Sequence, residues 1–318
     1  MALITQRTNI GESFTGKPKR VSWERLWTFS GGPFKLEGWP ARNIHTDLEY
    51  ANASGLPDKV AASATQFQGY VVQLMIDLFG VEWLSNGTLD VKFIAIVHAG
   101  DTLVAKTMVQ SKEEQDGATK FTMDVYCENQ RGEKVLVGLA TGIIGKVAPR
   151  GLEEYNNRLA ELGALCTQLS PEGSPQLEPL EYVVTPELNQ QFLYAEEDFH
   201  PRYIEETESG PPIVHPALIL NWSNGTRSPS YRAPTLQSGQ QSGQSIRAGF
   251  HARDEAFFYN PARVGGKLKV IWTNVGSYEK RGRPYSTGET IVVNEDGLEI
   301  IRRLHYDTTA SQEYKVKG

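Results

Sequence analysis

The feature of this sequence that most constrains its fold is an internal repeat. Three pairs of segments lie 165 positions apart: HAGDTL (98–103) and RVGGKL (263–268), ENQRGEKVL (128–136) and VNEDGLEII (293–301), and Phe93 and Phe258. About 55 residues near the end of each half therefore align without a gap, and such self-similarity is typical of a duplicated structural unit. We expect two copies of one structural unit within the 318 residues.

Each copy has the pattern of one helix followed by long strands. The segment TKFTMDVYCEN alternates apolar and polar residues, which is typical of a strand with one buried face, and NQRGEK and NEDG are typical of hairpin turns. In the first half, apolar residues recur at helical spacing from Ala62 to Phe79, and Gly80 would end that helix. A shorter apolar run, His215 to Trp222, occupies the matching place in the second half. The sequence therefore predicts an α+β fold in which a sheet wraps each helix.

Composition along the chain predicts its division into parts. We expect a solvated N-terminal tail over residues 1–19, a first half over 20–165, a linker over 166–180 and a second half over 181–318. The linker is predicted from a Ser/Pro-rich stretch, TQLSPEGSPQLEPLEY, that has no periodicity. Residues 223–245 are rich in Gly, Ser and Gln, and we expect a mobile inserted loop there.

Charge and cysteine content limit the compartment and the partners. The net charge is −6, so the chain offers no basic field to a nucleic-acid backbone or an anionic membrane. The longest apolar run, Val135 to Gly145, is far shorter than the roughly 20 residues that a membrane span needs, and the first residues lack the apolar segment of a signal peptide. Two cysteines exclude a disulfide framework, and no pair of His, Cys, Asp or Glu has metal-ligand spacing. We expect a soluble cytoplasmic protein, and we identify no metal or other cofactor.

Segments in both halves resemble the active-site region of the MaoC-like acyl-CoA hydratases and dehydratases. In that family a loop of the form G-D-x-N-P-L-H-x-D-x-x-x-A precedes a helix that opens with P-[IV]-x-H-G. PARNIHTDLEYA matches the second part of the loop, with His45 and Asp47 on its histidine and following aspartate. EDFHPRYIEE and PPIVHPALI give a second match, which places Asp198 on the catalytic aspartate, Tyr203 on the histidine and His215 at the start of the helix. The resemblance implies a double hot-dog fold.

Both halves depart from the family pattern. Pro40 stands where the family has the catalytic aspartate, so the first half keeps His45 but lacks its partner. In the second half the aspartate is kept, but Tyr203 replaces the histidine and Pro216 removes an N–H from the start of the helix. We therefore assign the chemistry to the first half and a structural or substrate-covering role to the second.

The resemblance implies the hydration of a 2-enoyl thioester. A base takes a proton from water, an acid protonates the α-carbon, and amide N–H groups hold the enolate oxygen. His45 would be the acid/base, and the amide of Ser63, beside the helix N-terminus, would form part of the oxyanion hole. Asp47 or an unidentified carboxylate would be the second proton-transfer group, although a loop-stabilising contact or a helix cap also explains Asp47.

Other residues are candidates for substrate binding. Arg42 can hold a phosphate or carboxylate, Asn43 can orient a carbonyl, and Gln66 can reach the site from the first helical turns. Loop structure and a solvated helix face explain the same three residues. The second-half candidates are Asp198, Tyr203 and His215. A composite pair of His45 and Asp198 is disfavoured, because the two sites of a double hot-dog lie apart.

We therefore predict a hydro-lyase that acts on a 2-enoyl or 3-hydroxyacyl thioester, most naturally one linked to CoA. Two alternatives stay open. One is a lyase, isomerase or cyclase that acts on another carbonyl substrate with a single titratable group. The other is a non-catalytic acyl-binding or scaffold protein. The expected partner is the small-molecule substrate alone, bound by a monomer or a homodimer.

Overall fold

The repeat in the sequence is also a repeat in the structure. The computed structural model describes residues 3–35, 37–56, 58–115, 117–146, 149–170, 177–208, 210–231 and 249–309. Three strands of the first half reappear in the second half with bounds shifted by 165 positions: β4 (Thr102–Gln115), β5 (Ala118–Asn129) and β6 (Lys134–Ile144) correspond to β10 (Lys267–Lys280), β11 (Arg283–Asn294) and β12 (Glu299–Thr309). The isolated bridges Ala61–His98 and Ile213–Arg263 also occupy matching places.

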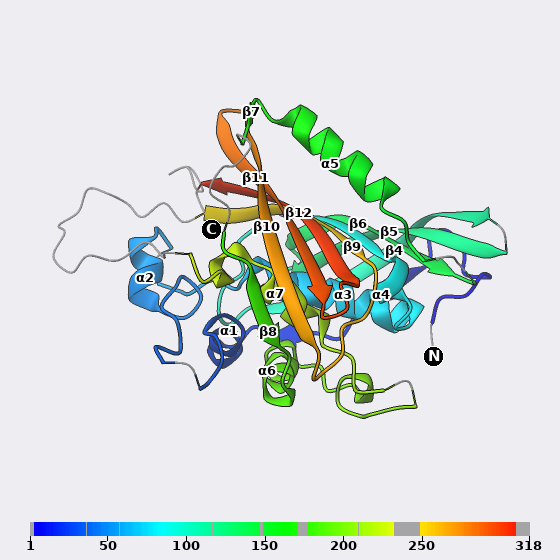
Figure 1. The fold of residues 1–318 in the computed structure, drawn as a ribbon, viewed down its shortest axis with the longest axis horizontal. Coiled ribbons are helices and arrows are strands. Elements are labelled where there is room, and N and C mark those ends of the chain that lie inside the picture. Colours follow the sequence, from blue (N-terminus) through cyan, green and yellow to red (C-terminus); the bar gives the residue numbers. More distant parts are fainter. Residues whose placement is uncertain are drawn as a thin grey trace.

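One continuous antiparallel sheet joins the two halves (Figure 1). The described strands pair in the order β1-β4-β5-β6-β3-β9-β12-β11-β10-β7, with β2 added beside β4 and β8 beside β10. The junction lies between β3 (Thr88–Phe93) and β9 (Gly249–Phe258), which pair from Thr88 with Phe257 to Lys92 with Arg253. The two halves therefore share backbone hydrogen bonds as well as side-chain contacts.

Each half of the sheet wraps a central helix. In the first half this is α3 (Ala64–Phe79), which begins two residues later than the periodicity predicted and ends at Gly80 as predicted. In the second half it is α7 (Pro216–Trp222), for which His215 is the N-cap. The helices approach so closely that a Cβ on Gly69 would lie 2.9 Å from the Cβ of Ala217, so only glycine fits at this contact.

The remaining helices and turns cover the ends and the outer face of the sheet. They are α1 (Trp23–Ser30), α2 (Leu48–Ala53), α4 (Trp83–Asn86), α6 (Pro186–Glu196) and the 3₁₀ turns η1 (Pro201–Tyr203) and η2 (Gly225–Arg227). The helix α5 (Glu153–Leu165) lies on the outer face of the second half's sheet, where Tyr155 packs edge-on against Phe257 (Figure 1). The sequence analysis did not anticipate α5.

Two segments that were expected to be irregular are part of the sheet. The solvated tail predicted for residues 1–19 is wrong for its described part, because β1 (Ser13–Thr15) and β2 (Lys19–Arg20) pair with β4 and Ile4 is buried. The predicted linker contributes β7 (Gln168–Leu169), and β8 (Leu180–Val183) begins at its end; both strands pair with β10. Residues 171–176 lie outside the described part.

The segment predicted as a mobile inserted loop begins as ordered structure. Asn224 caps η2, the Ser228 hydroxyl donates to the Glu178 carbonyl at 2.7 Å, and the Trp272 indole donates to the Ser223 carbonyl at 2.8 Å. Long-range contacts therefore fix residues 223–231, although their composition lacks core-forming residues. Residues 232–248 lie outside the described part of the chain.

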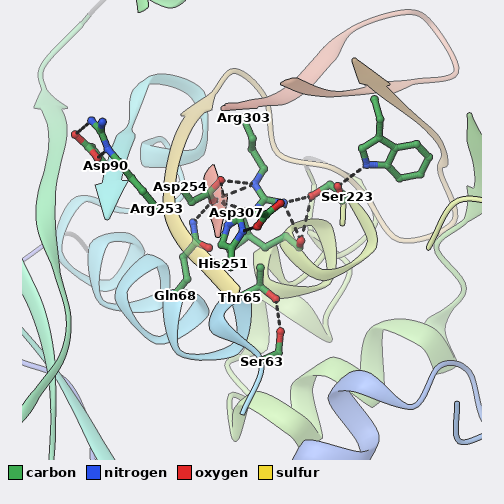
Figure 2. A network of polar contacts seen from close by, with 12 residues as sticks. Ser63, Thr65, Gln68, Asp90, Ser223, His251, Arg253, Asp254, Arg303 and Asp307 are labelled. Carbon is green, nitrogen blue, oxygen red and sulfur yellow. Dashed lines mark hydrogen bonds and ion pairs between the residues drawn. The ribbon is translucent and has the colours of Figure 1, made fainter. Parts of the chain in front are cut away.

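A buried ionic network ties both central helices to the sheet (Figure 2). The guanidinium of Arg303 donates to Asp254 on the neighbouring strand, and to the Leu220 carbonyl and Ser223 hydroxyl at the end of α7. From α3, the Gln68 amide donates to the same carboxylate at 2.5 Å. Burial alone would raise the pKa of Asp254, but Arg303, the neighbouring His251 and Gln68 hold it below its usual range.

Removing one member of this network should destabilise the whole protein. We expect Asp254→Ala to lower the free energy of unfolding by about 3–5 kcal/mol, because it leaves the Arg303 charge buried without its partner. Urea unfolding followed by circular dichroism measures the loss. Asp296→Ala, in the exposed β11–β12 turn, is the matched control and should change stability by no more than about 0.5 kcal/mol. Equal effects of the two substitutions would contradict the role given to the network.

The network also predicts a pH dependence of stability. Burial would lower the pKa of His251, but Asp254 and Asp307 raise it to about 9. A raised pKa in the folded state means that the stabilisation is complete below the unfolded value of about 6.5 and is lost as the pH rises through 9. The difference in free energy of unfolding between the wild type and His251→Gln should therefore be larger at pH 6 than at pH 9.5. A difference that is independent of pH would rule out this charge.

Candidate functional site

The loop that carries His45 lies between α1 and α2 and is held by its own polar groups. The side-chain amide of Asn43 donates to the carbonyls of Ser30 and Ala41, at 3.1 and 3.2 Å, and its oxygen accepts from the His45 amide at 2.9 Å. Asn43 therefore shapes the loop and presents His45. This use of its side chain corresponds to the loop-structure alternative that the sequence left open.

His45 has a defined tautomer and an unused ring nitrogen. Its Nδ1 lies 2.8 Å from the Ala61 carbonyl oxygen, and because a carbonyl only accepts, Nδ1 carries the proton. The other nitrogen, Nε2, has no hydrogen-bond partner among the described residues. The side chain is half-buried; burial lowers its pKa to about 4, the Ala61 bond opposes this shift, and the charge of Arg227 adds to it. At neutral pH the ring is therefore uncharged, with a free lone pair on Nε2.

Asp47 is engaged away from the ring of His45. It is the N-cap of α2, accepting from the Tyr50 amide at 2.9 Å, and its other oxygen accepts from Arg42 at 2.5 Å. Arg42 also donates to Glu49 at 2.8 Å, so its guanidinium is paired with two carboxylates on the surface. The hydrogen bond from Arg42 holds the pKa of Asp47 below its usual range. Both side chains thus have structural partners in this conformation.

The helix α3 begins three residues after Ala61, whose carbonyl fixes the ring of His45. Ser63 is the N-cap, but its hydroxyl pairs with the Thr65 hydroxyl at 2.9 Å and does not cap the helix. The backbone amide of Ser63 has no hydrogen-bond partner within the described ranges. Gln66 is buried and donates to the Ala195 carbonyl at 3.3 Å, which ties it to α6 of the second half. The free amide of Ser63 is therefore a donor available for an anionic oxygen at this end of α3.

In the second half, the three candidate residues Asp198, Tyr203 and His215 lie together, but the histidine is not available as a base. His215 Nε2 lies 3.4 Å from Asp198, and the Tyr203 ring packs against the imidazole with the ring centres 4.7 Å apart. His215 Nδ1 accepts from the Ala217 amide, so the proton is on Nε2 and points to Asp198. Burial lowers the pKa of His215. This histidine is fully buried, its Nδ1 lone pair is used by the Ala217 amide and its Nε2 carries the proton, so it has no lone pair to offer as a base.

A buried carboxyl group beside this cluster was not singled out from the sequence. Glu196 is fully buried, and neither of its carboxyl oxygens has a hydrogen-bond partner within the described part of the chain. Lys19 donates instead to the backbone carbonyls of Glu196 and Glu197, each at 2.8 Å. Burial raises the pKa of Glu196 well above its usual range, and the charge of Lys19 only partly opposes this. A single Glu at the end of a helix gives no sequence signal for such an environment.

Arg227 is the charged neighbour of His45 that the sequence analysis missed. It comes from η2 of the second half, and its charge contributes to the lowered pKa of His45. Its Nε and Nη2 donate to Asn221 Oδ1 at 3.1 and 2.5 Å, so the guanidinium is oriented by a neutral group. The candidate site is thus built from both halves. The composite pair of His45 with Asp198 is not formed, because the described hydrogen bonds of His45 go only to its own half.

In the part of the chain that the structure describes, no group of three or more His, Cys, Asp and Glu side chains is arranged to hold a metal ion. None of the helices formed by these residues combines the length and apolarity needed to cross a membrane.

Comparisons with known proteins identify the architecture. No protein-family model matches the sequence, and no curated protein matches it significantly. Among solved structures, a MaoC domain protein from Chloroflexus aurantiacus is similar over 95% of both chains, at 12% identity and a TM-score of 0.66. A conserved hypothetical protein of Mycobacterium tuberculosis with a double hot-dog fold is similar over 95% of this chain and 97% of that one, at 11% identity and a TM-score of 0.59. The present chain has the double hot-dog fold.

A MaoC-like dehydratase is also similar over 95% of this chain and 98% of its own, at 14% identity and a TM-score of 0.60. At such identities the likeness shows the fold and leaves the chemistry to the site. In this double hot-dog, the first half presents a histidine with a free lone pair on Nε2, and the second half presents one whose only lone pair, on Nδ1, accepts from the Ala217 amide.

The tautomer and pKa of His45 can be measured directly. We expect ¹⁵N-resolved NMR to show the proton on Nδ1 at pH 7 and a pKa of about 4, because burial disfavours the charged ring. A pKa that is lowered in the folded state also means that stability falls as the pH drops from about 6.5 to 4, where only the unfolded chain takes up the proton. A proton on Nε2, or a pKa above 6, would contradict the assigned environment.

Proposed function

We propose that this chain is a hydratase or dehydratase that acts on a 2-enoyl or 3-hydroxyacyl thioester. The observation that carries the proposal is the state of His45, a neutral imidazole whose Nδ1–H is fixed by Ala61 and whose Nε2 lone pair is free. It lies next to the start of α3, where the Ser63 amide has no partner among the described residues. A MaoC-like dehydratase among the proteins of the same fold supports the substrate class.

A single histidine can perform both proton transfers. In hydration, Nε2 accepts a proton from water as the water oxygen attacks the β-carbon, and the electron pair of the double bond moves toward the thioester oxygen. The Ser63 amide and the positive end of α3 stabilise the resulting enolate. The imidazolium then returns the proton from Nε2 to the α-carbon, so that one molecule of water is added across the bond. Dehydration follows the same path in reverse.

The proposed mechanism differs from the family pattern because it lacks a second proton-transfer residue beside His45. The resemblance implied an aspartate partner, but Pro40 occupies that place and Asp47 is bound to Arg42 and to the first turn of α2. No carboxylate of the described residues forms a hydrogen bond with His45. The same observation favours a second candidate, an isomerase or lyase that uses His45 as its only base on a related carbonyl substrate. Incorporation of water distinguishes the two.

Replacement of the histidine tests the proposed base. We expect His45→Ala to lower kcat/KM for 2-enoyl-CoA substrates by about 10²–10⁴-fold, the usual loss when a general acid/base is removed. The conjugated double bond is followed by absorbance over a panel of chain lengths. His200→Ala is the matched control, because this exposed histidine caps only η1 and should leave turnover within about twofold.

The isotopic composition of the product then assigns the reaction. A hydratase run in H₂¹⁸O places ¹⁸O on the β-carbon, whereas an isomerase incorporates none. Turnover that survives His45→Ala would remove His45 from the mechanism. Failure of the wild type on every thioester in the panel would exclude the hydratase and leave either an enzyme that acts on a different carbonyl substrate or the non-catalytic acyl-binding protein.

A further inference from the structure

We propose that Arg227, together with the indole of Trp39, is the receptor for a carboxylate carried by the acyl part of the substrate. The inference rests on the proposed function, because it names the substrate class of the same site: acyl thioesters with a second, ionised carboxyl group. The receptor comes from η2 of the second half and from the loop after α1 of the first, whereas the base is His45 of the first half.

Arg227 is a largely buried charge that has no counter-charge among the residues that the structure describes. Its protein partners are the side-chain oxygen of Asn221, the Phe29 carbonyl at 3.5 Å and the ring of Trp222, all of them neutral. In the described part of the chain no carboxylate forms an ion pair with it. The sequence contains no Asp or Glu between Glu208 and Asp254, so the residues that follow η2 supply none either.

A buried guanidinium without a counter-charge destabilises the protein unless a ligand supplies an anion. Removing a guanidinium from water without an anion to pair with costs several kcal/mol. Burial lowers the pKa of Arg227 only to about 10, so the group is still charged at neutral pH. A ligand carboxylate would supply the missing charge and would bind through strong charge-assisted hydrogen bonds.

Two free donors converge on one turn of the chain. The Nη1 of Arg227 has no partner among the described residues and lies 3.6 Å from where a Cβ on Gly32 would stand. The indole of Trp39 borders the same position, with its Cδ1 at 3.7 Å, and its adjacent Nε1 is buried without a hydrogen-bond partner. A Cβ on Gly32 would be in van der Waals contact with both groups, so Arg227 and Trp39 border the same position beside this glycine.

The positions of Arg227 and His45 allow both residues to contact the same substrate molecule. Arg227 donates to the Phe29 carbonyl, and Asn43, which holds the His45 loop, donates to the adjacent Ser30 carbonyl, so both groups are anchored at the end of α1. The charge of Arg227 also lowers the pKa of His45. A carboxylate on Arg227 and a double bond at His45 can therefore belong to one acyl chain. The surroundings include the rings of Trp222 and of Tyr182, which packs on it, and they match an acyl chain better than a strongly hydrated group. One guanidinium also matches the single charge of a carboxylate, whereas a phosphate brings up to two.

Binding of small acids tests the receptor without any turnover. Succinate, butyrate and inorganic phosphate are titrated into the wild type, Arg227→Gln and Trp39→Phe, with Arg7→Gln as the control for loss of one surface positive charge. We expect succinate to bind the wild type and Arg7→Gln equally, and Arg227→Gln about 10- to 100-fold more weakly, since a hydrogen bond to a charged group is lost. Trp39→Phe, which keeps an aromatic ring but removes the N–H, should weaken binding several-fold.

A measurement on the wild type covers the case in which a variant fails to fold. Succinate bound at Arg227 neutralises the charge that lowers the pKa of His45, so the pKa of His45 should rise with succinate and stay unchanged with butyrate. Succinate that binds no better than butyrate, or binding that is indifferent to Arg227, overturns the proposal. Preference for phosphate over succinate overturns it as well, because the receptor would then serve a phosphate.

Kinetics separates this proposal from the function on which it rests. The ratio of kcat/KM for glutaconyl-CoA over crotonyl-CoA should fall about 10- to 100-fold in Arg227→Gln. Succinate binding that depends on Arg227, without turnover of either thioester, supports the receptor and rejects the hydratase. Turnover of crotonyl-CoA that depends on His45, without Arg227-dependent succinate binding, supports the hydratase and rejects the receptor.

Discussion

The buried ion pair of Arg303 and Asp254 is the constraint on which the arrangement of the two halves depends. Its partners come from α3, from the end of α7 and from two strands of the second half, so satisfying its hydrogen bonds fixes these elements relative to one another. A buried charge pair tolerates little displacement, because each lost bond leaves a charge in a medium of low dielectric. The close approach of Gly69 to Ala217 is a second contact between the same two helices.

This fixed arrangement brings together groups that are far apart in the sequence. His45 depends on Ala61, which precedes α3, and Arg227 depends on Asn221, which lies in α7. The relative placement of base and guanidinium is therefore set by the packing of α3 on α7.

Duplication explains the shared framework, and local hydrogen bonding explains the division of roles. Both halves place a histidine close to the start of a central helix. In the first half the ring donates to a carbonyl and keeps a lone pair, whereas in the second it accepts from the helix and donates toward Asp198. The difference arises because His215 is itself the N-cap of α7, while His45 lies on a separate loop held by Asn43. The same residue type is thus available for chemistry in one copy and occupied in the other.

The sequence by itself determined the repeat, the helix α3, the hairpins and the loop that carries His45, because these follow from local periodicity and from residue spacing along one segment. It did not reveal that the N-terminal segment and the expected linker are strands, since each pairs with a partner more than 80 residues away. Nor could it decide the fate of Asp47, the tautomer of His45 or the importance of Arg227. Those properties depend on which carbonyl, amide or charge lies within a few ångströms, and in a chain of this topology such neighbours come from distant segments that only the tertiary structure brings together.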